Sequence, residues 1–252
     1  MNAFFRWVLY TVLVLAVLAT AAHLGGRIWL RWYLESEDFA LDAREAVYDA
    51  TGVKGRFLPF RWDNRILSCD GFRGTGDADG GVEALDAEEV RIRVATRGWI
   101  WRTWWIESVD IKRVGLRGSG VPRFHVGAQP QAVHAGVSLA LPMSEPMYIQ
   151  GVYIANFHAA WRVGGKSLVV KNLVVKGAPE GAAWRVVATQ GILHYGGSRP
   201  VTVKTLDVRW KPHQLDVLDA HVDLAPTSFL RGMATVVLED LYPMKCTVSG
   251  EG

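Results

Sequence analysis

The sequence predicts a mainly β fold, in which an N-terminal transmembrane helix and a short second helix precede a long run of antiparallel strands. Three observations predict it. Residues 7–26 form an uncharged apolar segment, helical periodicity is confined to the stretch that follows, and beyond Gly52 apolar and polar residues alternate with a period of two. Such alternation is typical of strands that bury one face.

The first 34 residues are predicted to form a membrane anchor and its interfacial exit. Residues 7–26 contain no Lys, Arg, Asp or Glu. These 20 residues, at about 1.5 Å each, span roughly 30 Å, enough to cross the hydrocarbon core of a bilayer. A cleaved signal peptide is the alternative, with an AxA-like site at residues 19–21. Trp29 and Trp32 beside arginines favour the uncleaved anchor, because such residues suit a membrane interface.

Residues 35–52 are predicted to form a short helical collar. Ser36 is a candidate N-cap and Gly52 a candidate C-cap. One face of this helix is expected to carry the apolar residues Phe39, Ala43, Ala46 and Val47.

Residues 53–252 are predicted to form a β-rich domain of successive hairpins. In the segment EEVRIRVAT, Val90, Ile92 and Val94 face one way and charged residues face the other. The same signature recurs in ESVDIKRVGLRG, KSLVVKNLVVKG, AWRVVATQGILHY, VTVKTLDVRW and LDVLDAHVDLAP, with glycine-rich turns between them. A proline-rich stretch near residues 120–147 is expected to be a joint between two halves.

No motif in the sequence predicts catalysis, a metal site or a cofactor. The triplet Gly165-Lys166-Ser167 resembles the end of a phosphate-binding loop, but Ala160 stands where the first glycine belongs and a strand follows. A hairpin turn is therefore expected there. The net charge is +3 without any long basic run, which argues against nucleic acid as a partner. Cys69 and Cys246 are expected to be free thiols, with pairing left open.

The stretch GWIWRTWWIE has the highest local density of tryptophan in the chain. Trp99, Trp101, Trp104 and Trp105 are four of the 11 tryptophans. Tryptophan at this density is typical of core packing, of a protein interface or of a loop pressed into lipid headgroups. Core packing is the simplest interpretation, and contact with a membrane or a partner is the functional one.

The layout resembles that of the AsmA-like proteins of diderm bacteria, relatives of the bridge-like lipid transfer proteins. The resemblance rests on the N-terminal anchor, the helix ending YDATGVKGRF, and the couplet ALDAEEVRIRV…WIESVDIKRVGLRG; the later segments GVYIANFHAAWRV, KNLVVKG and TLDVRW are similar in style. It implies a long bent sheet forming a groove that is apolar inside. It also implies an inner-membrane, single-pass protein with its C-terminal domain in the periplasm.

Two functions follow as expectations. The first is lipid handling, in which the groove shields acyl chains for envelope lipid homeostasis or transport, lined by candidates Val90, Ile92, Val94, Val109 and Ile111. The second is a scaffold subunit of an envelope assembly, similar in size and layout to protein N of type II secretion. Membrane lipids and other envelope proteins are the expected partners, and an enzyme is the weakest interpretation.

Overall fold

The computed structural model describes most of the chain beyond residue 27. The described residues are 28–76, 81–95, 105–120, 148–211, 214–225, 228–237 and 245–251. The expected anchor at residues 1–34 therefore lies largely outside them, as does nearly all of the expected joint at 120–147. Within the described ranges, no helix has both the length and the apolar character needed to cross a membrane.

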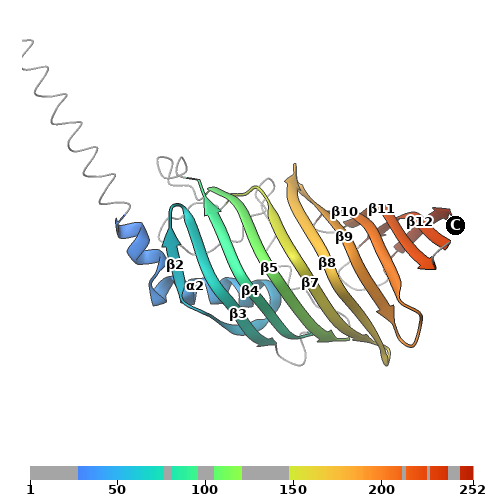
Figure 1. The fold of residues 1–252 in the computed structure, drawn as a ribbon, viewed down its shortest axis with the longest axis horizontal. Coiled ribbons are helices and arrows are strands. Elements are labelled where there is room, and N and C mark those ends of the chain that lie inside the picture. The colour runs from blue at the N-terminus through green and yellow to red at the C-terminus, as the bar shows by residue number, and fades with distance from the viewer. Residues whose placement is uncertain are drawn as a thin grey trace, which may run out of the picture.

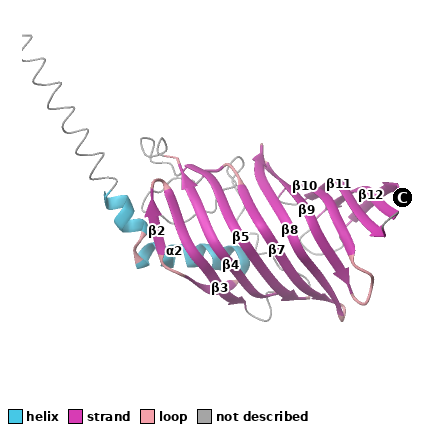
Figure 2. Cartoon of the chain, viewed as in Figure 1, coloured by secondary structure: helices cyan, strands magenta, loops and turns pink. Residues whose placement is uncertain are grey.

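The protein is mainly β, and its strands form one long, curved, open sheet (Figures 1 and 2). Helix α2 spans Glu37–Thr51, and a further helical segment covers residues 28–34. The strands are β1 (Val53–Phe57), β2 (Phe60–Asp63), β3 (Ile66–Gly76), β4 (Val82–Val94), β5 (Trp105–Ser119), β6 (Tyr148–Ile149), β7 (Val152–Val163), β8 (Lys166–Glu180), β9 (Ala183–Tyr195), β10 (Val201–Lys211), β11 (Gln214–Ala225), β12 (Ser228–Val237) and β13 (Lys245–Glu251).

The strand order follows the chain, β1-β3-β4-β5-β7-β8-β9-β10-β11-β12-β13, with β2 also paired to β3 and β6 to β5. Hairpins connect β7 through β11, as the alternation predicts. The expectation of an unbroken antiparallel meander is wrong at one place, because β5 pairs with both β6 and β7 in parallel. The sheet is therefore continuous from β5 to β7, with the expected joint falling between these two strands in the chain.

Helix α2 begins and ends where the sequence predicts. The Ser36 hydroxyl accepts a hydrogen bond from the Phe39 amide, and Gly52 at φ +70° donates its amide to the Tyr48 carbonyl. These contacts satisfy backbone groups that a helix end leaves unpaired. The caps fix the helix against the first strand, which starts directly at Val53.

The main core lies between the helices and one face of the first strands. Leu34 and Phe39 are buried there against Phe60, Leu67 and residues of β4 and β5. Figure 1 shows α2 running across one face of the sheet at its N-terminal end. A second cluster of Val53, Phe72 and Val82 continues this covered region.

Several strands are bent by bulges, which explains the curvature of the sheet. Asn172 in β8 and Gln190 in β9 have positive φ angles of 56° and 65°. Pairing between these strands jumps from Lys171 opposite Ile192 to Val174 opposite Thr189, so the two residues lie at the same irregularity. A further register shift follows Val203 in β10. Bulges bend a strand and increase its twist.

Candidate functional site: an open apolar face

The face of the sheet that packs under α2 continues as a series of apolar rows across the later strands. Val175 on β8 stands opposite Ala188 on β9, which stands opposite Leu206 on β10. Leu206 in turn stands opposite Ala220 on β11. Residues directly opposite one another in an antiparallel sheet project from the same face. The rows on either side repeat the pattern with Val186, Val208 and Val217, and with Gly191, Val203 and Val222.

We call the surface formed by these rows on β7–β11 the open apolar face. Its centre is already well packed, since Leu173, Ala188 and Val203 are buried. Leu173 lies so close to Gly191 that a Cβ at position 191 would clash with the Leu173 side chain. Around this centre the side chains are half-buried, and the residues packed against it are Phe157, Val170, Val175, Leu193, Leu206 and Val222.

No described helix covers the open apolar face. Helix α2 packs on the early strands of the sheet and has its main contacts with β1. An apolar sheet face normally needs a second layer, because exposed apolar area costs about 25 cal/mol per Å². Among the described residues this layer is present over β1–β5 and absent over β7–β12, so the face is suited to an apolar occupant.

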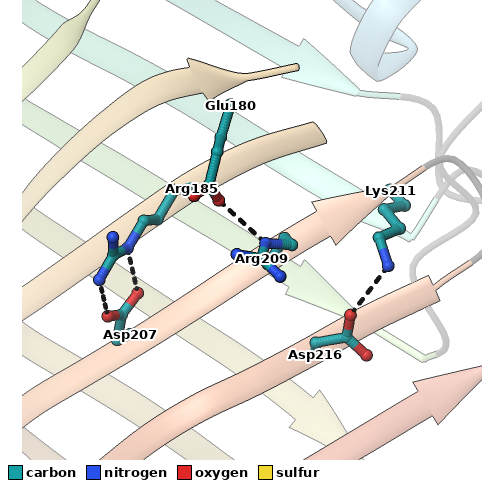
Figure 3. Close-up of polar contacts among 6 residues, drawn as sticks. All are labelled: Glu180, Arg185, Asp207, Arg209, Lys211 and Asp216. Atoms are coloured by element: carbon teal, nitrogen blue, oxygen red, sulfur yellow. Dashed lines mark hydrogen bonds and ion pairs between the residues drawn. The ribbon is translucent and has the colours of Figure 1, made fainter. Parts of the chain in front are cut away.

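The opposite face of the same strands is polar and is crossed by ion pairs (Figure 3). Arg185 donates two hydrogen bonds to the Asp207 carboxylate, at 3.1 and 2.7 Å. Arg209 Nε lies 2.9 Å from Glu180 Oε2. Lys211 on β10 and Asp216 on β11 form a further pair at 3.3 Å. The ion pairs make this face of the sheet polar and suited to contact with water, whereas the other face is apolar.

These contacts perturb the carboxylates of the polar face. The hydrogen bond from Arg209 holds the pKa of Glu180 below its usual value. The pKa of Asp216 is lowered by hydrogen bonds from Gln214 and Lys211, and that of Asp219 by the hydrogen bond from Arg231. All three carboxylates are therefore stabilised in their ionised form in the folded protein.

The candidate lining residues of the sequence analysis lie in the covered part of the same face. Val90 stands opposite Ile111, and Ile92 stands opposite Val109. Val90 and Val94 are buried, and all five candidates belong to or pack against the core beneath the helices. Their partners are thus protein side chains, and the exposed apolar surface begins further along the sheet.

The structure separates the candidate tryptophans. Trp29 and Trp32 are exposed on the helical segment 28–34. Trp105, at the start of β5, is half-buried and stacks on Tyr148 with ring centroids 5.4 Å apart. Trp99, Trp101 and Trp104 lie outside the described residues.

The cysteines lie on strands at different ends of the sheet. Cys69 on β3 is a buried free thiol that donates to the Leu58 and Gly71 carbonyls, and burial raises its pKa. Cys246 is on β13, nine strands away in the sheet order. Neighbouring strands are about 4.8 Å apart, so the two cysteines are separated by far more than a disulfide can span. An intramolecular disulfide between Cys69 and Cys246 is therefore excluded.

Neither relatives nor a metal site identify the function. No protein-family model matches the chain, and no curated protein matches it. Within the described ranges, no three His, Cys, Asp or Glu side chains are grouped so that they could hold a metal ion. The open apolar face is the feature from which a function can be argued.

Proposed function

We propose that the protein is a membrane-anchored lipid-binding protein whose open apolar face shields acyl chains from water. One observation carries the proposal: unbroken apolar rows run across β8–β11 on a face that no described element covers. The function is binding rather than catalysis.

The chemistry of the rows favours acyl chains over a polar ligand. In the three paired rows from Val186 to Gly191, every side chain that β9, β10 and β11 contribute is aliphatic or absent. A site for a polar small molecule places a few hydrogen-bonding groups among its apolar residues to fix orientation. Acyl chains need no such groups, so a purely aliphatic surface suits them.

The N-terminal sequence supports a location at a membrane. Residues 7–26 are uncharged and long enough to cross a bilayer. In this proposal the chain is a short AsmA-like protein of the inner membrane with its sheet in the periplasm. It would hold lipids during envelope lipid homeostasis or transport.

A photoreactive amino acid placed at Leu206 tests the proposal. Leu206 projects from the open apolar face, whereas its neighbour Thr205 pairs with Thr189 and His221 on the polar face. The two full-length variants are irradiated in cells and analysed by mass spectrometry after purification. We expect adducts with the mass of membrane lipids at position 206 and none at position 205.

Other adducts would contradict the proposal. A cross-link from position 206 to the chain itself would show that a segment of the protein closes the face. A cross-link to a second protein would favour the scaffold function, in which the face docks a subunit of an envelope assembly. Equal lipid labelling at both positions would show that lipid contact is not specific to this face.

A further inference from the structure

The tryptophans gather along one long edge of the sheet. Seven tryptophans lie in the described residues. Four of them are at the edge where β4, β8 and β10 end and β5, β7, β9 and β11 begin: Trp62, Trp105, Trp184 and Trp210. Trp29 and Trp32 are on the helical segment 28–34, which is joined to this edge by the hydrogen bond from the Trp62 amide to Glu35. Only Trp161, of those described, is at the opposite edge. Figure 1 shows these strand ends along the upper edge of the sheet.

Three indoles on this edge are well exposed. Trp32 is 69% exposed, Trp29 42% and Trp210 51%. Trp210 stands opposite Trp184, so a pair of indoles ends the open apolar face at this edge. An indole combines an apolar ring with an N–H donor, and tryptophan is therefore enriched where a protein meets lipid headgroups.

The helical segment 28–34, which follows the apolar residues 7–26 in the sequence, is held at the same edge by contacts to α2 and to β2. Trp29 stacks on Tyr33 with ring centroids 5.7 Å apart, and the Tyr33 hydroxyl lies 2.9 Å from Asp42 Oδ2. The Glu35 carboxylate then accepts a hydrogen bond from the Trp62 amide, at 3.0 Å.

We infer that this tryptophan edge lies along the surface of a phospholipid bilayer, from the helical segment to Trp210. The sheet then stands with its strand ends on the membrane, and its long axis runs along the membrane instead of away from it. The open apolar face begins directly at the headgroups. The inference rests on the membrane attachment in the proposed function, and does not require that the face bind acyl chains.

A fluorescent probe at Trp210 tests the inference, with Tyr195 as the matched control. Both residues are half-exposed aromatics, 51% and 45% exposed, but Tyr195 is at the opposite edge of the sheet. Each is replaced by Cys in the full chain carrying Cys246→Ser, and labelled with an environment-sensitive nitrobenzoxadiazole dye. Buried Cys69 is kept, and the chain without an added Cys gives the background.

The labelled chains are reconstituted into vesicles of phosphatidylethanolamine and phosphatidylglycerol that contain a lipid with a nitroxide on its headgroup. A nitroxide quenches a dye only at short range. We expect loss of fluorescence for the label at position 210, relative to vesicles without the nitroxide lipid, and no loss at position 195. Equal quenching at both positions, or none at 210, would overturn the inference. Lys211→Cys provides a second label at the same edge.

A label at Trp32 separates this inference from the proposed function. Quenching at position 32 without quenching at 210 would mean that the sheet is anchored at one end and projects away from the bilayer. Absence of quenching at both positions would overturn the membrane attachment itself. A third outcome is quenching at position 210 without lipid adducts at position 206 in the cross-linking experiment. It would support the contact of the edge with the bilayer and contradict acyl-chain binding by the open apolar face.

Discussion

At the residue scale, the backbone conformation of a few residues in mid-strand shapes the sheet. Glu89, Asn172 and Gln190 adopt positive φ inside strands β4, β8 and β9. For a residue with a Cβ this conformation costs about 1–2 kcal/mol, and Asn tolerates it better than Glu or Gln. The rest of the sheet must offset this cost by holding the strands in their bent form. We therefore expect these positions to be sensitive to substitution.

The substitution Gln190→Val tests this strain. Valine is favoured in ordinary strands, but a β-branched residue at φ 65° clashes with its own backbone. Because Gln190 already bears the cost of positive φ, we expect only the additional strain of the β-branched side chain. This should lower the free energy of unfolding by about 1 kcal/mol, measured by urea denaturation and circular dichroism. Thr189→Val, one residue earlier in the same strand, is the control and should change stability little. Equal effects would show that the bulge carries no such constraint.

At the scale of single elements, α2 is the piece that separates the covered from the open part of the sheet. Its position depends on the connection to segment 28–34. There the Ser36 hydroxyl donates to the Tyr33 carbonyl at 2.6 Å and accepts from the Phe39 amide at 3.3 Å. One side chain thus links the end of one helix to the start of the next.

The substitution Ser36→Ala should therefore destabilise the domain. Removal of an N-cap side chain typically costs about 1 kcal/mol, because a helix amide loses its acceptor. Thermal unfolding of the full chain in mild detergent measures the effect. Ser36→Asp keeps an acceptor for the Phe39 amide and should retain most of the stability. Equal losses in both variants would place the effect in the lost bond to Tyr33.

The sequence predicted most elements correctly, but not how all of them assemble. Alternation located β4, β5 and β8–β11, and capping residues located α2, since these signals are local. The parallel pairing of β5 with β7 was missed because alternation does not identify a strand's partner. The pattern around Val90 is also the same as that around Val203, so sequence could not show that a helix covers only the first.

At the scale of the whole molecule, the two faces of β8–β12 differ in polarity and favour different surroundings. Aliphatic rows occupy one face, and the other carries the ion pairs of Arg185, Arg209, Lys211 and Arg231 with their carboxylates. Exposed ion pairs contribute little each, so they do not offset the cost of leaving the apolar face in contact with water. The charged face then determines how the sheet responds to pH.

The polar face makes the sheet sensitive to acid in a defined direction. The folded-state pKa values of Glu180, Asp216 and Asp219 lie below their usual values. A carboxylate with a lowered pKa contributes stability above its unfolded pKa, which is about 4, and this contribution disappears as the pH falls through the lower folded value. The melting temperature should therefore decline below about pH 4.

In the double variant Glu180→Gln/Asp219→Asn, the melting temperature should fall less steeply below about pH 4. The variant removes two of the three carboxylates whose folded-state pKa is lowered. Thermal unfolding followed by circular dichroism across the acid range measures the slope. Glu45→Gln removes an exposed carboxylate from α2, outside the ladder, and should leave the slope unchanged. If the double variant loses stability in acid as steeply as the parent chain, the ion pairs of Glu180 and Asp219 do not control the pH response.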